Sequence, residues 1–375
     1  MRICVPTEIK NNEYRVALTP AGVHDLAASG HDVFVQRGAG IGSSMTDAEY
    51  EAAGATLLDD AAEVWARAEL LLKVKEPIAD EYGFFRDDLV LFTYLHLAAD
   101  RPLTDRLVAD GVTAIAYETV QLPGAVGRPG GLPLLAPMSE VAGRLAPTVG
   151  AATLLRSAGG LGLLMSGVPG TRPASVTVIG GGVAGANSAL IAAGLGADVT
   201  IFDTNIARLR FLDDHFQGRV KTAASNPLDL DRAVVGSDLV IGSVLIPGAK
   251  APKLVTNDMV ARMRPGSVLV DIAVDQGGCF EDTRPTTHAD PTFEVHGSVF
   301  YCVANMPGAV PNTSTSALTN ATLPYIRRIA SHGWQHALRA DPALAAGLNT
   351  TGGHLVNAGV AAAHGVAATP LADAL

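Results

Sequence analysis

Three polar side chains in the first third of the chain each follow a short apolar run. The three are Lys75, His96 and Glu118. A fourth polar side chain, that of Arg15, lies in the segment after the apolar run at residues 2–5. If the runs are parallel strands, ligands bind outside their carboxyl ends. Histidine suits proton transfer near neutral pH, whereas arginine and lysine suit a substrate carboxylate or a carbonyl oxygen. The set predicts a substrate-binding rim, although each residue alone also fits a surface charge, a buried histidine or a turn cap.

A glycine turn in the middle of the chain separates two further apolar runs, and the second run ends at Asp203. Gly180, Gly182 and Gly185 have the G-x-G-x-x-G spacing. The three glycines allow a tight turn, close approach of a pyrophosphate, and close packing of helix on strand. The pyrophosphate would lie over free N–H groups at the start of the helix. Asp203 is placed to bind the ribose hydroxyls and to repel a 2′-phosphate, so the pattern predicts a site for NAD rather than NADP.

Two aspartates stand in and after the apolar run that begins at residue 268. Asp271 lies inside the expected strand, and we interpret it as structural. Asp275 lies beyond the strand, where it could order a substrate amine or move a proton, or act as an ordinary turn aspartate. Arg328 and His332 share a helical face without a carboxylate partner, and the cysteines have no C-x-x-C spacing. No metal site is therefore expected.

The composition is typical of a globular protein with two domains. The chain has 375 residues, of which 48% are hydrophobic and 17% charged, and this length exceeds what one compact core usually holds. A net charge of −10 argues against nucleic acid and anionic membranes as partners. There is no signal-type apolar segment at the N-terminus and no unbroken apolar stretch of membrane-spanning length. We read Cys4, Cys279 and Cys302 as buried reduced thiols and expect a cytoplasmic protein.

Alternating strand and helix patterns predict an α/β fold of two Rossmann-like, doubly wound parallel-sheet domains with a cleft between them. Strands are expected at residues 2–5, 32–35, 69–73, 89–93, 112–117, 176–180, 198–202, 239–243, 267–271 and 299–303. Helices are expected at residues 20–29, 47–53, 59–67, 101–110, 137–155, 316–331 and 333–346.

The first domain is expected to be discontinuous in sequence. No strand is expected after residue 303, so the last two helices should pack back on the first domain. The result is a substrate domain of residues 1–136 and 307–375 and an NAD-binding domain of residues 137–306. The helix that begins at residue 137 should connect them. A proline- and glycine-rich stretch at 121–134 should form an exposed loop.

Over nearly its whole length the chain resembles the family of alanine dehydrogenases and the nucleotide-binding subunit of nicotinamide nucleotide transhydrogenase. The resemblance rests on the glycine turn and on motifs at residues 6–17, 74–77, 94–97, 137–144, 271–278 and 304–311. It implies reversible, NAD-linked oxidative deamination of L-alanine to pyruvate and ammonia, and assembly as a homohexamer. The chain departs from the family at residues 123–133, where the loop is longer, and this departure leaves the site motifs intact.

The resemblance also implies roles for individual residues. Arg15 and Lys75 match the substrate-binding residues, His96 matches the acid/base, and Asp275 matches a second catalytic group. The positions that match cofactor contacts, in addition to the three glycines, are Ser139, Val183, Ala184, Asp203, Arg208, Ser225, Val244, Leu245, Ile272, Ala273, Val274, Asp275, Arg284, Val303, Ala304, Asn305 and Met306.

Three other functions stay open at this point. A soluble nucleotide-binding subunit of a transhydrogenase would use the same NAD-binding domain, but it would need a membrane partner. A dehydrogenase of another small amino acid, such as one that links glycine and glyoxylate, would use the same motifs. A non-catalytic NAD-binding regulator would leave Lys75 and His96 as structural residues. NADH formation that depends on an amino acid distinguishes these functions.

Overall fold

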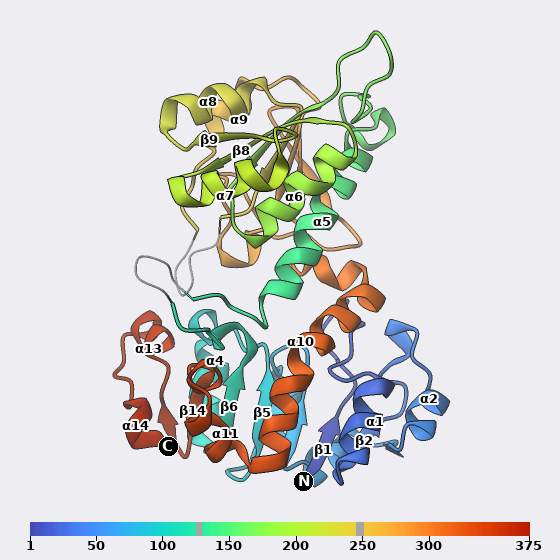
Figure 1. Ribbon diagram of the computed structural model, residues 1–375, viewed down its shortest axis with the longest axis vertical. Coiled ribbons are helices and arrows are strands. Elements are labelled where there is room, and N and C mark those ends of the chain that lie inside the picture. The colour runs from blue at the N-terminus through green and yellow to red at the C-terminus, as the bar shows by residue number, and fades with distance from the viewer. Residues whose placement is uncertain (125–129, 245–250) are drawn as a thin grey trace. The chain divides into compact units, whose positions relative to one another are not determined.

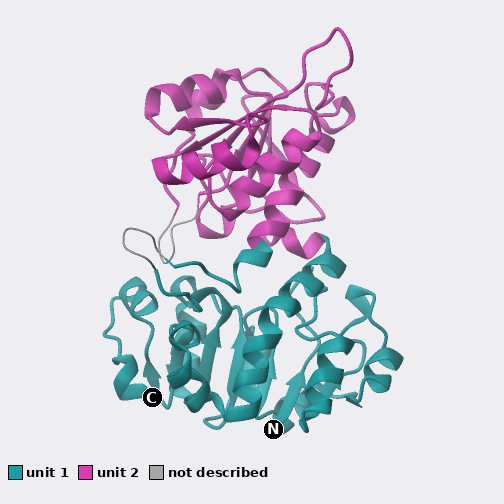
Figure 2. Ribbon diagram, viewed as in Figure 1, with its two compact units in different colours: residues 1–138, 310–375 teal, residues 139–309 magenta. Residues whose placement is uncertain are grey.

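The computed structural model describes residues 1–124, 130–244 and 251–375 of the chain. The chain forms two compact units, residues 1–138 with 310–375 (unit 1) and residues 139–309 (unit 2) (Figure 2). The predicted domain limits, after residues 136 and 306, lie a few residues before these. Helix α5, Ala136–Thr153, carries the chain from unit 1 into unit 2 (Figure 1).

Unit 1 is built on an eight-stranded sheet of order β15-β14-β6-β5-β4-β1-β2-β3. Strands β1 to β6 are parallel and follow the 3-2-1-4-5-6 order of dinucleotide-binding folds, and β14 joins antiparallel to β6. The central strands are short apolar runs because a sheet covered on both faces excludes unpaired polar side chains. The strands are β1 Arg2–Val5, β2 Asp32–Gln36, β3 Thr56–Leu58, β4 Leu70–Leu72, β5 Val90–Thr93, β6 Thr113–Ala116, β14 Leu348–Thr351 and β15 His354–Leu355.

The helices of unit 1 begin at residues that suit an N-cap. The hydroxyl of Thr19 accepts the N–H of Gly22 at the start of α1, and Thr46 forms a capping box with Glu49 at α2. Asp100 caps α4 in the same way as Thr19 caps α1, through its side chain. The helices are α1 Pro20–Ala28, α2 Asp47–Ala52, α3 Ala61–Arg67, α4 Arg101–Ala109, α10 Pro311–His332, α11 Trp334–Ala340, α12 Pro342–Ala345, α13 Ala358–His364 and α14 Leu371–Ala374.

Unit 2 has a seven-stranded sheet of order β12-β13-β11-β10-β7-β8-β9, in which the six parallel strands repeat the order of β1 to β6, with β13 in the place of β6. Its strands are parallel except β12, which pairs antiparallel with β13 at the edge. The strands are β7 Ser175–Ile179, β8 Asp198–Asp203, β9 Lys221–Ala224, β10 Leu239–Gly242, β11 Val268–Asp271, β12 Thr292–Val295 and β13 Ser298–Tyr301. The helices after α5 are α6 Val183–Gly194, α7 Ile206–Phe216, α8 Pro227–Gly236 and α9 Asn257–Ala261.

Different helices cover the two faces of the unit 2 sheet. Ile241 of β10 belongs to a buried cluster that includes Ala146 of α5. Its neighbour Val240 belongs to a second cluster, with Val234 of α8 and Val260 of α9. Because successive strand residues point to opposite faces, the sheet is buried on both sides. The α/β class with two doubly wound sheets is thus confirmed.

The sequence-based expectations fail mainly at the edges of the sheets. Each expected strand is present, but β3, β9 and β12 were not predicted, and all three are edge strands. Edge strands are short and half-polar, so they lack the continuous apolar run of a central strand. The expectation of one helix over residues 333–346 is also wrong, because Asp341 ends α11 and caps α12.

The expectation that no strand follows residue 303 is wrong as well. β14 has the sequence LNTT, yet each of its residues is buried. Its polar side chains are satisfied within the sheet: Thr350 donates to the carbonyl of Val112 at 2.9 Å, and the hydroxyls of Thr351 and Thr113 lie 2.8 Å apart. Such pairing is invisible to an apolar pattern. In the expected exposed loop at 121–134, residues 121–124 are exposed, residues 125–129 lie outside the described part, and the expectation is wrong at Leu134, which is buried.

Candidate active site

The carboxyl ends of β1 and β4 carry the first part of the site. These strands are neighbours where the strand order reverses, which is where open α/β sheets bind ligands. The hydroxyl of Thr315 on α10 accepts the N–H of Val16 at 3.1 Å. The hydroxyl of Ser43 lies 2.7 Å from that of Thr315 and donates to the carbonyl of Tyr14 at 2.9 Å. The loop that carries Arg15 is therefore anchored on both sides of this residue.

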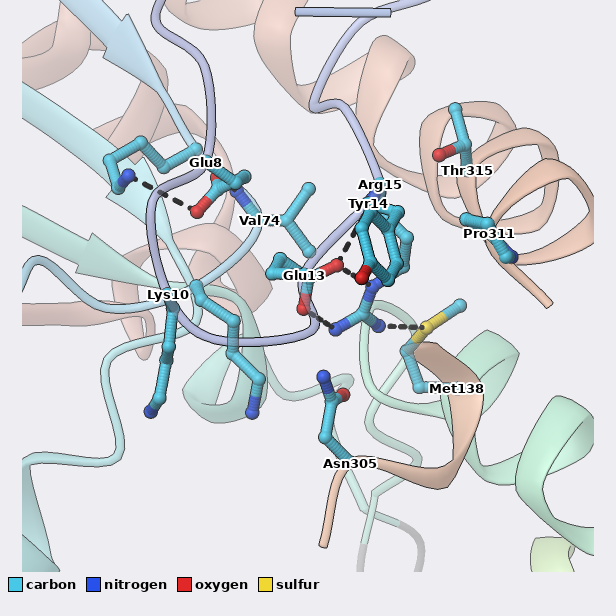
Figure 3. Close-up of polar contacts among 12 residues, drawn as sticks. Glu8, Lys10, Glu13, Tyr14, Arg15, Val74, Met138, Asn305, Pro311 and Thr315 are labelled. Carbon is cyan, nitrogen blue, oxygen red and sulfur yellow. Dashed lines mark hydrogen bonds and ion pairs between the residues drawn. The ribbon is translucent and has the colours of Figure 1, made fainter. Parts of the chain in front are cut away.

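Arg15 is a buried cation held by a buried carboxylate. Its Nε and one terminal nitrogen bind the two oxygens of Glu13 at 2.6 Å and 2.5 Å, and neither side chain is more than 2% exposed (Figure 3). The other terminal nitrogen lies 3.0 Å from Sδ of Met138. Burial opposes the charge of Arg15, but the hydrogen bonds and charge of Glu13 outweigh it and raise the pKa of Arg15. A guanidinium fixed in this way stays charged and can orient a carboxylate.

The segment after β4 that carries Lys75 is fixed by a buried ion cluster. Nζ of Lys73 lies 3.1 Å from Oε2 of Glu8 and 2.8 Å from Oε1 of Glu81, and these side chains are at most 4% exposed. Oε1 of Glu8 accepts the N–H of Val74 at 2.6 Å. Burial opposes the charge of Lys73, but the two carboxylates outweigh it and raise the pKa of Lys73. Lys75 itself is half-buried on this fixed segment.

His96 follows β5 in a left-handed backbone conformation, with a φ of 51°. Oε1 of Glu118 supports this turn, because it accepts the N–H of His96 at 2.6 Å and that of Leu95 at 3.1 Å. Nδ1 of the imidazole lies 3.0 Å from Oε2 of Glu76, and the ring stacks on Tyr94 with centroids 6.0 Å apart. The side chain of His96 is 38% exposed. The imidazole thus reaches solvent while one of its nitrogens is held, which is not the environment of a core histidine.

Sequence reasoning placed Glu118 on the rim but did not assign the carboxylates that partner the cations and the histidine. Glu13 pairs with Arg15, Glu8 pairs with Lys73, and Glu76 pairs with His96. Glu118 supports the turn that carries His96 rather than the turn that follows Glu118 itself. Lys73 was also missed, although it stands at the end of an apolar run. A charge in such a run must be paired when it is buried, and that rule was the available signal.

The glycine turn of unit 2 has the geometry that its spacing predicts. Gly180 has a φ of 100°, in the region that favours glycine. A Cβ on Gly185 would lie 1.8 Å from the carbonyl oxygen of Gly180, whereas a Cβ on Gly182 would meet no atom within 4 Å. Gly182 is the N-cap of α6, so free N–H groups of the first helical turn follow an open backbone. This cradle fits a pyrophosphate.

Two further residues brace the first turn of α6, and neither was assigned from the sequence. A Cβ on Gly143 of α5 would lie 2.3 Å from the carbonyl oxygen of Ala184. The hydroxyl of Ser188 donates to the carbonyl of Gly143 at 2.9 Å. Helices α5 and α6 are therefore in direct backbone contact beside the glycine turn.

Asp203 ends β8 at the edge of the glycine turn. Its Oδ2 accepts the N–H of Gly181 at 2.7 Å, and its Oδ1 accepts that of Asn205 at 2.8 Å. Nε of Arg208 donates to the carbonyl of Gly181, and the guanidinium stacks over Phe211 at 4.9 Å. Burial lowers the pKa of Arg208. The edge of the turn thus carries a carboxylate that accepts two backbone N–H groups, while the nearby guanidinium is engaged by backbone carbonyls and a ring.

Most of the other predicted cofactor contacts follow strands at the carboxyl edge of the unit 2 sheet. Val183 and Ala184 open α6. The others at this edge are Ser225 after β9, Val244 after β10, residues 272–275 after β11 and residues 303–306 after β13. Several of their side chains are buried, and these residues can offer a ligand only backbone groups: Ala273, Val274, Val303 and Met306.

Two further predicted cofactor contacts do not directly follow a strand of this edge. Ser139 lies in the first turns of α5. The guanidinium of Arg284 stacks over the ring of Phe293 in β12, 4.2 Å from its centroid. Leu245 lies outside the described residues.

The two aspartates near β11 have different surroundings. Asp271 is fully buried and accepts the N–H groups of Ala273 at 3.0 Å and Cys279 at 2.8 Å and the hydroxyl of Thr283 at 2.5 Å. Burial raises the pKa of Asp271 in spite of these bonds. Asp275 is exposed, and its Oδ2 lies 3.4 Å from the N–H of Asn305. Only Asp275 is therefore accessible to a ligand.

Within residues 1–124, 130–244 and 251–375, no helix has the length and apolarity that crossing a membrane requires. The same residues contain no cluster of three or more His, Cys, Asp or Glu side chains that could hold a metal ion.

Comparison with known proteins gives consistent matches over the whole chain. The family description "Alanine dehydrogenase/PNT" matches twice, as an N-terminal domain over residues 4–142 and a C-terminal domain over residues 146–358. A protein of Mycolicibacterium smegmatis named alanine dehydrogenase is 62% identical, over 96% of this chain and 96% of its own length. One of Mycobacterium tuberculosis with the same name is 60% identical over 100% of both chains.

Two solved structures show the same architecture. An L-alanine dehydrogenase superposes with a TM-score of 0.92 at 50% identity, covering 97% of this chain and 99% of its own. A transhydrogenase from Sinorhizobium meliloti superposes with a TM-score of 0.78 at 26% identity, covering 96% and 99%. The similarity in sequence and structure thus extends across both units.

Proposed function

The chain belongs to the alanine dehydrogenase/PNT family, and on this premise we propose that it is an NAD-dependent enzyme that converts L-alanine to pyruvate and ammonia. The observation that carries the proposal is the full-length identity of 60% and 62% with proteins named alanine dehydrogenase. Identity with the transhydrogenase structure is 26%, against 50% for the L-alanine dehydrogenase structure. Transhydrogenation is therefore the less favoured function.

The cofactor proposal rests on the glycine turn and Asp203. Gly182 leaves open space where a pyrophosphate would approach the start of α6, and the carboxylate of Asp203 favours two ribose hydroxyls over a 2′-phosphate. When bound, NAD supplies the acceptor for the hydride that leaves the substrate carbon. The chain's own residues must then bind and orient the amino acid and move its protons.

Arg15 and Lys75 are proposed to bind the substrate. The guanidinium of Arg15 is held by Glu13 through Nε and one terminal nitrogen, so pairing with the carboxylate of the amino acid falls to its other terminal nitrogen, on the side of Met138. Lys75, on the segment fixed through Lys73, can bind the same carboxylate or polarise the carbonyl oxygen of pyruvate. Because both cations stand on fixed loops, binding of the carboxylate also holds the reacting carbon in a fixed position.

His96 is proposed to move protons at the substrate nitrogen and oxygen. After loss of the hydride and one proton of its ammonium group, L-alanine is an iminium ion, to which water adds at the former Cα. The imidazole takes a proton from that water and gives it to the departing ammonia, and pyruvate remains. The balance is one L-alanine, one NAD⁺ and one water consumed for pyruvate, ammonium, NADH and one proton.

Further parts of the proposal come from the family resemblance. Asp275 would order the nitrogen of the substrate, and the glycine turn and strand ends of unit 2 would form the cofactor site. Residues 1–136 with 307–375 would form the substrate domain and residues 137–306 the NAD-binding domain. The protein would act as a cytoplasmic homohexamer, which light scattering on a size-exclusion column would test.

A spectrophotometric screen of amino acids with NAD and with NADP tests the proposed function. L-Alanine with NAD should give NADH at a rate far above that with NADP, because Asp203 repels the additional phosphate. Glycine should give a smaller rate. Rapid NADH formation from another amino acid, with none from L-alanine, would overturn the substrate assignment. Transfer between NADH and an NADP analogue without any amino acid would favour transhydrogenation.

A further inference from the structure

Glu76 connects the imidazole of His96 to a lysine from another loop. Its Oε2 lies 3.0 Å from Nδ1 of His96, and its Oε1 forms an ion pair with Nζ of Lys10. Glu76 follows β4, His96 follows β5 and Lys10 follows β1, so the three groups come from three adjacent strands. The side chain of Glu76 is 11% exposed, whereas those of His96 and Lys10 are 38% and 40% exposed. A buried carboxylate thus joins two side chains that reach solvent.

The protonation state of Glu76 determines which imidazole nitrogen carries the proton. Burial would raise the pKa of Glu76, but its hydrogen bond with His96 and the charges of His96, Lys75 and Lys10 outweigh burial and hold the pKa well below its ordinary value. An ionised carboxylate only accepts hydrogen bonds. The contact with Nδ1 therefore requires Nδ1 to be the donor, and in the neutral ring this leaves the lone pair on Nε2.

Glu118 and Tyr94 also lie beside His96. Glu118 faces the backbone of His96 rather than its ring, since its oxygens accept the N–H groups of Leu95 and His96. Tyr94 stacks on the ring, and its hydroxyl donates to the carbonyl of Leu134 at 2.5 Å. Glu76 is thus the carboxylate in hydrogen-bond contact with the ring among the described residues, and the charges of Lys10 and Lys75 act on that carboxylate.

We propose that Glu76 is a positioning residue that fixes the tautomer of His96, so that Nε2 is the atom that takes and gives the proton, and that Lys10 weakens this effect by sharing the carboxylate. The inference rests on the proposed role of His96 in the dehydrogenase reaction. Glu76, Lys10 and His96 then form a charge-linked set, in which Glu76 contacts both other residues. His96 is the base, and Glu76 is the group that orients it. Neither Glu76 nor Lys10 touches the substrate in this account.

Nitrogen-15 NMR of histidine-labelled protein tests the inference without turnover. The His96→Gln protein identifies the signals of His96 by their loss. In the unaltered protein, His96 should show a protonated Nδ1 and an unprotonated Nε2 at high pH. In Glu76→Gln, the amide can either accept or donate, so the population should shift toward protonated Nε2. An unchanged tautomer in Glu76→Gln would overturn the inference whether or not the protein oxidises alanine.

The pH profile of pyruvate amination gives an independent readout. At a fixed concentration of free ammonia, kcat/KM for pyruvate should fall at high pH, where the proton donor is lost. Removing the carboxylate in Glu76→Gln should move this limb to lower pH by about one unit, and Lys10→Gln should move it by a smaller amount to higher pH. Opposite shifts of the high-pH limb in Glu76→Gln and Lys10→Gln would show that the charges of the two residues act on one group. Damage to the fold would not move the limb in opposite directions in the two variants.

Glu63→Gln is the matched control, because it removes one carboxylate from an exposed pair with Arg67 on α3. Its pH limb and His96 signals should equal those of the unaltered protein. Equal limbs in the unaltered, Glu76→Gln and Lys10→Gln proteins would overturn the inference. If Glu76→Gln does not fold, the half-exposed Lys10 still permits the test. Failure of the unaltered protein to aminate pyruvate would overturn the proposed function instead, and the tautomer measurement would still decide the inference.

Discussion

The two sheets share the order of their six parallel strands but build their ligand sites in different ways. In unit 2, the turn after β7 is three glycines long, and α6 follows at once with its N–H groups exposed to a ligand. In unit 1, residues 6–19 separate β1 from α1, contain no glycine, and include the buried charges of Glu8, Glu13 and Arg15. The site of unit 2 is thus built mainly of backbone groups, and the site of unit 1 mainly of side chains. The same topology therefore supports two kinds of chemistry.

The difference follows from what each ligand needs. A pyrophosphate is bound by N–H groups of a helix start, which need only glycines that leave room. A small amino acid presents a carboxylate and a reacting nitrogen, and these need charges held in fixed positions. Unit 1 holds them with buried ion pairs between distant parts of the chain, such as Lys73 with Glu8. Buried charges of this kind are costly to leave unpaired, so this site depends on its partners more than the glycine turn does.

The largest expected effect is on turnover in His96→Ala. Loss of the proposed proton carrier should lower kcat for alanine oxidation by about 10²–10⁴-fold. Binding of NADH should not change, because the predicted cofactor contacts lie in unit 2. Steady-state kinetics and fluorescence titration of NADH measure the two quantities. Unchanged turnover would remove His96 from its role.

The next effect is on stability in Lys73→Ala. Removal of the cation leaves Glu8 and Glu81 buried without it, so the free energy of unfolding should fall by about 3–5 kcal/mol. Arg67→Ala breaks an exposed pair with Glu63 and should cost less than about 1 kcal/mol. Urea denaturation measures both changes. Similar losses in the two variants would show that unit 1 does not depend on buried charge.

The smallest expected effect is the pH dependence of stability in Glu76→Gln. The pKa of Glu76 is lower in the folded protein than its ordinary value of 4.5. The contribution of Glu76 to the free energy of unfolding is therefore complete above pH 4.5 and is lost as the pH falls through the lowered pKa. At neutral pH the variant should melt about 2–4 °C below the unaltered protein. Melting curves at successively lower pH should show this gap closing below about pH 4.5. A gap that widens there would contradict the assigned direction.

The comparison of the units also explains what could be predicted from the sequence. Central strands such as Leu70–Leu72 are continuous apolar runs, and the glycine turn has a spacing with a physical reason for each glycine. These features are local, so they can be recognised in one segment. Edge strands such as Thr292–Val295 were missed because half of their surface is polar. β14 was missed because its polar side chains are paired only in the folded sheet.

The site was predictable to the same degree. Lys75 and His96 were proposed as site residues because they follow apolar runs. Their partners were not found, because Glu76 reaches His96 across 20 residues of chain and Glu8 reaches Lys73 across 65. No local pattern connects such residues. Pairing of this kind requires the strand order, which brings the loops after β1, β4 and β5 to one edge of the sheet.

The central claim is that the backbone of the glycine turn in unit 2 binds the cofactor, whereas side chains of unit 1 act on the substrate. The Kd of NADH in three variants tests this claim most directly. Gly182→Ala adds a methyl group where no atom lies within 4 Å, so the fold should persist while the approach of the pyrophosphate is blocked. Gly194→Ala adds one at the other end of α6, also in open space, and serves as the control. Fluorescence titration should show a Kd at least about tenfold higher in Gly182→Ala, equivalent to about 1.4 kcal/mol, and unchanged in Gly194→Ala and His96→Ala. Normal binding by Gly182→Ala, or equal weakening in His96→Ala, would contradict the account.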